Sequence, residues 1–110
     1  MTTPNPRLAV ARELAGWLRR QYGDIVADVR LYGSVARGSD DALSDVDLLI
    51  LVRRVLSRAE REELSQRAYK ADLEHGTVTQ CLVRTVTEWE RPEVQCGGLA
   101  REVAREGVAL

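Results

Sequence analysis

The stretch that decides the fold runs from Leu31 to Val52 and reads LYGSVARGSDDALSDVDLLILV. One apolar run ends at Gly33-Ser34, and a second begins directly behind Asp45 and Asp47. The residues that follow Asp47 are apolar without interruption, which predicts a strand buried on both faces. Aspartate is disfavoured in strands, so two aspartates at the start of this predicted strand conflict with the preference of the apolar residues for a strand. We expect a functional reason for that conflict.

Composition limits the classes of protein to consider. At 110 residues the chain is expected to form one domain spanning residues 1–110. A formal charge of −1 without a basic block argues against direct nucleic acid binding. No apolar run approaches the length of about 20 residues that spans a bilayer, and the N-terminus lacks a signal-peptide layout. Cys81 and Cys96 have no metal-like or redox-like spacing, so we expect reduced thiols in a cytoplasmic protein.

The predicted order of the elements is helix, strand, strand, helix, strand, helix. This order favours an α/β or α+β fold, with a sheet covered by helices on one or both faces. Ser57 and Glu60 form a capping box at the start of the second long helix. The expected elements are a helix over 6–22, strands over 25–33, 45–52 and 77–86, a helix over 57–75, a turn or loop over 35–44 and a last helix within 93–107.

Asp45 and Asp47 suggest a metal site. Residues two apart on a strand project from the same face, and the strand rise separates their Cβ atoms by roughly 6–7 Å. Two carboxylates at that separation repel each other unless a cation lies near them. Magnesium prefers oxygen ligands and usually takes one or two carboxylates together with substrate phosphates. Asp45 and Asp47 are therefore the predicted catalytic and metal-binding pair.

Gly33-Ser34 offers donors for a phosphate. Glycine at a strand end lets the backbone approach a ligand closely, and a serine that begins a short helical turn presents its hydroxyl and N–H groups to an anion. Arg37 returns to the same side of that turn and can bind phosphate oxygens through two N–H groups. With Ser44, which precedes Asp45, these residues form the predicted nucleotide-binding and phosphate-binding set.

Each part of this pattern has an ordinary explanation when it stands alone. An isolated Asp-x-Asp is commonly a solvated junction between loop and strand, and an isolated Gly-Ser is commonly a turn. Asp40 and Asp41 are most simply turn residues. His75 is expected to cap a helix C-terminus rather than to bind a metal. The joint occurrence of Gly-Ser, ten residues that end in Ser44, and Asp-x-Asp entering an apolar strand favours a nucleotidyl transfer or phosphoryl transfer site.

At these residues the sequence resembles the minimal nucleotidyltransferase branch of the DNA-polymerase-β-like nucleotidyltransferase superfamily. The hallmark of that family is Gly-Ser, ten residues and Asp-x-Asp, and Gly33-Ser34 to Asp45-Val46-Asp47 matches it without a gap. The resemblance implies a small mixed sheet with helices packed on it. It also implies Mg²⁺-dependent transfer of AMP from ATP, with Asp45 and Asp47 holding the metal and Gly33 and Ser34 holding the triphosphate.

The resemblance further implies a partner, because small family members often act as antitoxins that add AMP to a tyrosine of a HEPN-domain toxin. Active members usually carry a third carboxylate on a later strand, and here Val78 or Gln80 stands at that position. Two alternatives therefore stay open beside the antitoxin enzyme. The chain could neutralise its partner by binding, with weak or no turnover, or it could modify a small molecule such as an antibiotic. Both a homo-oligomer and a hetero-oligomer with the toxin are compatible with the sequence.

Overall fold

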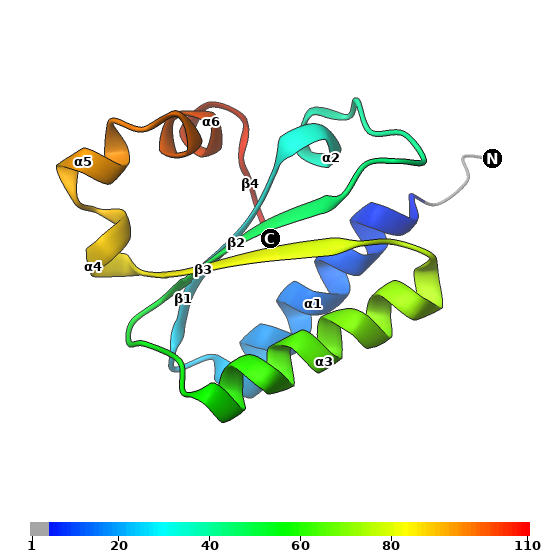
Figure 1. The fold of residues 1–110 in the computed structure, drawn as a ribbon, viewed down its shortest axis with the longest axis horizontal. Helices are drawn as coiled ribbons and strands as arrows, with labels where there is room; N and C mark the ends of the chain where they lie inside the picture. Colours follow the sequence, from blue (N-terminus) through cyan, green and yellow to red (C-terminus); the bar gives the residue numbers. More distant parts are fainter. Residues whose placement is uncertain (1–4) are drawn as a thin grey trace.

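The structure is a computed structural model that describes residues 5–110. Its elements appear in Figure 1, where two long helices lie below the sheet and shorter helices lie above it. The helices are α1 (Pro6–Tyr22), α2 (Gly33–Arg37), α3 (Arg58–His75), α4 (Val86–Trp89), α5 (Pro92–Gln95) and α6 (Gly98–Glu106). The strands are β1 (Val26–Tyr32), β2 (Val46–Val52), β3 (Thr79–Thr85) and β4 (Val108–Ala109).

The sheet is mixed, as expected from the family resemblance. Its strand order is β3-β2-β1-β4, in which β1 pairs antiparallel with both β2 and β4, while β2 pairs parallel with β3. The central strand β2 has antiparallel and parallel neighbours, so Asp47 lies opposite Tyr32 on one side and Gln80 on the other.

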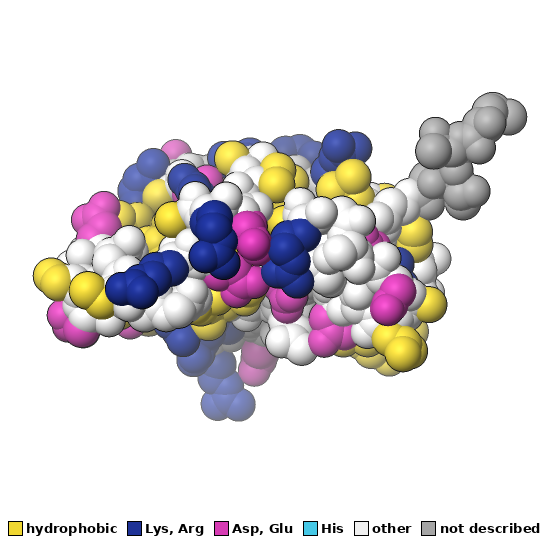
Figure 2. Space-filling view, turned by 90° about the horizontal axis from the view of Figure 1, so that it is seen from above, with side chains coloured by type: hydrophobic (Ala, Val, Ile, Leu, Met, Phe, Trp, Pro, Cys, Tyr) yellow, Lys and Arg dark blue, Asp and Glu magenta, His cyan; other side chains and the backbone are white. Residues whose placement is uncertain are grey.

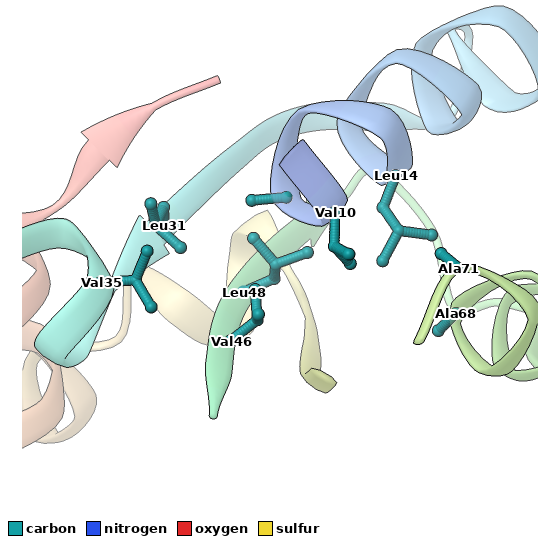
Figure 3. Close-up of a cluster of buried hydrophobic side chains, with 9 residues drawn as sticks. Val10, Leu14, Leu31, Val35, Val46, Leu48, Ala68 and Ala71 are labelled. Atoms are coloured by element: carbon teal, nitrogen blue, oxygen red, sulfur yellow. The ribbon is translucent and has the colours of Figure 1, made fainter. Parts of the chain in front are cut away.

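Alternation along β2 assigns its side chains to two layers. Leu48 and Ile50 point to the layer of α1 and α3, where they join two clusters of buried apolar side chains. Leu49 and Leu51 point to the opposite layer and pack with Val103 of α6. Figure 3 shows one cluster of the first layer, in which Val10, Leu14, Leu31, Val35, Val46, Leu48, Ala68 and Ala71 are labelled and to which Ala11 also belongs.

The long helices begin and end at the residues that the sequence indicates. Asn5 caps α1 with its side chain, and Pro6 occupies the first turn. The capping box at α3 is present, since Ser57 accepts a hydrogen bond from the Glu60 amide and Glu60 accepts one from the Ser57 amide. Gly76 ends α3 in a left-handed conformation with φ of 66°.

The region after β3 differs from the expectation of one last helix. It forms three helices and a short strand, because the chain turns at Glu90-Arg91, at Cys96-Gly97 and again at Gly107. The predicted loop over 35–44 is also shorter, since its first residues continue the helical turn α2. Among the described residues, no helix is long and apolar enough to cross a membrane.

Candidate nucleotide and metal site

Asp45 and Asp47 lie on the same face of the sheet, as predicted. Asp47 shares the alternation of Leu49 and Leu51, so its side chain points to the layer of α6. Gln80 lies beside Asp47 in the parallel register and donates a hydrogen bond from Nε2 to the Asp45 carboxylate at 2.7 Å. Gln80 of β3 therefore contacts Asp45, which precedes β2, and lies next to Asp47, which is part of β2.

Gly33 lies close to the Asp47 carboxylate. It adopts φ of 77°, a backbone conformation that other residues rarely take. An added Cβ there would overlap Oδ2 of Asp47 and lie only 3.4 Å from its Cγ. The requirement for glycine thus has two causes, the left-handed backbone and the close approach of the Asp47 side chain. The Gly-Ser turn and the acidic pair therefore lie side by side.

The pKa of the Asp47 carboxyl is raised above its usual range. Burial is the largest cause, followed by the negative charges of Asp45 and Glu102, and Arg37 opposes them. Burial is also the largest cause of the raised pKa of the Tyr32 hydroxyl, to which the charges of Asp47 and Glu102 add. These are the conditions in which a bound cation is favoured, because it neutralises charges that solvent screens incompletely.

Arg37 stands close to this pair but is held by other residues. Its Nη1 donates to Glu102 at 3.0 Å and to Glu106 at 3.1 Å, and both glutamates belong to α6. The exposed guanidinium nevertheless lies near enough to Asp47 to lower the pKa of that carboxyl. Figure 2, which views the molecule from above, shows acidic and basic side chains side by side near the middle of this face.

Ser44 shapes the loop before the site. Its hydroxyl accepts a hydrogen bond from the Asp41 amide at 3.0 Å, and its carbonyl accepts one from Arg7 Nε at 3.1 Å. Asp40 accepts bonds from Arg7 and Asn5, which ties the same loop to the start of α1. Asp41 has the turn role expected of it, because its Oδ1 accepts a hydrogen bond from the Leu43 amide at 2.9 Å, whereas the Asp40 carboxylate bonds to residues distant in the sequence. The hydroxyl of Ser44 is directed to Asp41 rather than to the acidic pair.

Of the two residues expected at the position of the third carboxylate, Gln80 lies in register with Asp47, whereas Val78 precedes β3 and is exposed. The acids that come before this strand are Asp72 and Glu74. Asp72 lies at the opposite layer. There its carboxylate accepts bonds from the Thr77 hydroxyl at 2.6 Å, the Thr79 amide at 2.9 Å and the Thr79 hydroxyl at 2.7 Å. Asp72 thus closes the turn from α3 into β3.

Two other features lie apart from this site. Glu13, Glu74 and His75 place their ligand atoms within 4.8 Å of one another where α1 meets the end of α3. Within this group His75 Nε2 lies 3.4 Å from Glu13 Oε2. A cavity of about 530 Å³ runs between α3 and β3 and is lined by Leu64, Ala68, Tyr69, Asp72, Cys81 and Val83, among others.

The site residues that the motif does not contain are Glu102 and Glu106. They follow Asp47 by more than fifty positions and carry no spacing signal that links them to it. The one local sign is their separation of four residues in a helix that buries Ala100 and Val103, which places both acids on one face.

With the geometry described, comparison with known proteins identifies the family. Residues 11–110 match the family described as the nucleotidyltransferase domain. The chain therefore belongs to the nucleotidyltransferase domain family. No curated protein matches its sequence significantly.

Solved structures with a similar fold point in the same direction. A candidate minimal nucleotidyltransferase superposes with a TM-score of 0.63 at 20% identity, over 100% of both chains. A toxin–antitoxin complex with AMP-PNP gives 0.61 at 20% identity, over 90% of this chain and 70% of that chain. The tri-AMPylated Shewanella oneidensis HEPN toxin in complex with its MNT antitoxin gives 0.55 at 17% identity, over 94% of this chain and 70% of that chain.

Proposed function

We propose that the protein transfers AMP from ATP to a protein acceptor, a tyrosine of a HEPN-domain toxin, and thereby acts as a cytoplasmic antitoxin. The observation that carries the proposal is the contact between Gly33 and the Asp47 carboxylate, with Asp45 on the same face. The family match supports nucleotidyl transfer. The similar fold of an MNT antitoxin bound to an AMPylated HEPN toxin supports the choice of acceptor.

Asp45 and Asp47 fit a divalent metal, because they are carboxylates that offer oxygen donors on one face, and the absence of a Cβ at Gly33 makes room for the Asp47 carboxylate there. Mg²⁺ bound there would neutralise the phosphate charge that develops during transfer. Gly33 and Ser34 would hold the triphosphate through backbone donors, and Arg37 would add a cationic donor.

In the proposed reaction the tyrosine oxygen attacks the α-phosphorus of ATP. The bond from that phosphorus to the oxygen bridging to the β-phosphate breaks, pyrophosphate leaves and the phenolic proton passes to a base. The role of the protein is to align these groups, since positioning and charge neutralisation account for most catalysis of this kind. Gln80 cannot accept the proton as a carboxylate would, so we assign it the role of orienting Asp45 through its hydrogen bond.

The experiment uses the chain, a HEPN partner encoded beside it, Mg²⁺ and ATP labelled on the α-phosphate. We expect label on the partner with the unaltered chain and none with Asp45→Asn/Asp47→Asn. Label that persists with the double variant would refute this site as the catalytic one. No label with either chain would refute AMP transfer to that partner.

One observation favours a second function. Gln80 stands in register with Asp47 where active relatives are expected to have an acid. The chain could then neutralise its partner by binding alone, with the site as a remnant. That function predicts complex formation and toxin inhibition that do not depend on ATP or Mg²⁺. A strict nucleotide requirement for inhibition would exclude it.

A further inference from the structure

Helix α6 presents two acidic side chains to Arg37. Glu102 and Glu106 are one helical turn apart and share a face. Arg37 Nη1 lies 3.0 Å from Glu102 Oε1 and 3.1 Å from Glu106 Oε2, which joins residues 65 and 69 positions apart in the sequence. The helix is fixed behind them, because Ala100 and Val103 are buried against the sheet. Arg37 is therefore held from a rigid element.

Both contacts use a single nitrogen of the guanidinium. Arginine carries five N–H groups, two of them on Nη1 and the other three on Nε and Nη2. The two glutamates engage Nη1 and no other nitrogen of Arg37. The edge formed by Nε and Nη2 keeps the parallel N–H pair that forks onto a phosphate. The arrangement thus restrains the side chain while leaving its phosphate-binding edge available.

We propose that Glu102 and Glu106 are positioning residues, which orient Arg37 so that its Nε–Nη2 edge meets the triphosphate beside Gly33-Ser34. This inference rests on the proposed function, because it takes the site to bind a nucleoside triphosphate. Arg37 lies on the surface, and a long exposed side chain loses rotamer freedom when it binds a ligand. Restraint by two carboxylates removes part of that loss before the nucleotide arrives.

The opposite role makes the opposite prediction. If the glutamates compete with phosphate for Arg37, their removal frees the guanidinium and tightens ATP binding. If they position Arg37, their removal weakens ATP binding by roughly three- to tenfold, the cost of immobilising one long side chain. The sign of the effect separates the two roles.

The test is a calorimetric titration with ATP and Mg²⁺ of the unaltered chain, Glu102→Ala/Glu106→Ala, Arg37→Ala and the triple variant. We expect weaker binding for the double variant and for Arg37→Ala, and no further loss in the triple variant, because the glutamates act through Arg37. Binding of AMP, which lacks the β- and γ-phosphates, is expected to be unchanged in the double variant. Glu102→Gln/Glu106→Gln keeps the size and the acceptor oxygens and is expected to lose less affinity in the same direction.

Melting temperatures of all variants establish that each is folded, and the glutamine pair carries the test by the same criteria if the alanine pair is not. Equal or tighter ATP binding by the glutamate variants overturns the proposal. A further loss in the triple variant also overturns it, because the glutamates would then act on the site without Arg37. No ATP binding by the unaltered chain refutes the proposed function itself, and the inference with it.

Discussion

The substitution Gly33→Ala tests the contact at the centre of the site, and the chain supplies its own control. Gly33 and Gly38 have almost the same backbone, with φ of 77° and 73°. An added Cβ at Gly33 overlaps the Asp47 carboxylate, whereas one at Gly38 meets nothing within 4 Å. The left-handed backbone costs an alanine about 1–2 kcal/mol at either position. The two variants therefore share a backbone penalty and differ in one contact.

The overlap between a methyl group at position 33 and the Asp47 carboxylate can be relieved with little loss of stability, but only by moving a residue of the candidate site. Oδ2 of Asp47 is the end of a side chain, so it can rotate away from a methyl group at position 33. We expect both variants to lose about 1–2 kcal/mol of unfolding free energy, which lowers the melting temperature by about 4 °C or more. We expect Gly33→Ala alone to lose MgATP affinity, by at least roughly tenfold, because a predicted ligand has moved.

Urea unfolding measures the first quantity and calorimetric titration with MgATP measures the second. Gly38→Ala is expected to bind MgATP as the unaltered chain does. Equal MgATP affinities for Gly33→Ala and Gly38→Ala would show that the Asp47 carboxylate takes no part in binding, and would refute the site as described.

Three further predictions concern single residues. Gln80→Glu places an acid beside Asp45, so it is expected to lower the stability of the metal-free protein and to tighten Mg²⁺ binding measured by calorimetry. Val78→Glu is the control at an exposed position. Equal effects of the two substitutions would place the expected acid elsewhere. Asp47→Asn is expected to be more stable than the unaltered chain without metal at pH 7. Because the pKa of Asp47 is raised in the folded state, ionising its carboxyl group destabilises the fold. The unfolding free energy therefore falls as pH rises from about 3.9, the usual aspartate pKa, through the folded-state pKa of Asp47. In urea unfolding the advantage of Asp47→Asn should vanish near pH 3, and an advantage that persists there would contradict this cause. Asp72→Ala is expected to lose about 2 kcal/mol in urea unfolding, because three donors lose their acceptor, while MgATP binding stays unchanged; a loss of binding would show that Asp72 serves the site.

The sequence predicted those parts of the fold that depend on local chemistry. Ser57 and Glu60 define the start of α3 through two reciprocal hydrogen bonds within four residues, and any chain with that pattern can form them. The unbroken apolar run after Asp47 predicted a central strand, and β2 has neighbours on both sides. The prediction that Asp45 and Asp47 share one face followed from strand periodicity alone.

The parts that the sequence did not predict depend on distant contacts. A last helix within 93–107 was expected, and α6 (Gly98–Glu106) confirms it, with its apolar side packed against Leu49 and Leu51. The short helices α4 and α5 before it were not predicted. Strand β4 has only two residues, and it forms because it pairs with β1. No local pattern specifies a pairing between segments nearly eighty positions apart.

For the candidate site as well, the motif residues were predicted from the sequence, and the contacts between distant residues were not. Gly33 and Asp47 were found from the motif, but their contact required the antiparallel pairing of β1 and β2. Glu102 and Glu106 were missed, because nothing in the sequence says that α6 will dock beside α2. Arg37 was assigned to phosphate from its place after the Gly-Ser turn, and the structure adds the two acids that hold one of its nitrogens.

The proposed metal site is best tested by a calorimetric titration of the chain with ATP, made once with Mg²⁺ and once with a chelator. Asp45 and Asp47 are held together at the cost of mutual repulsion, so we expect ATP to bind with Mg²⁺ and not with the chelator. We also expect Asp45→Asn/Asp47→Asn, although folded, to lose this dependence on the metal. ATP binding of equal strength with Mg²⁺ and with the chelator would contradict the claim that these two aspartates hold a metal bound to the nucleotide.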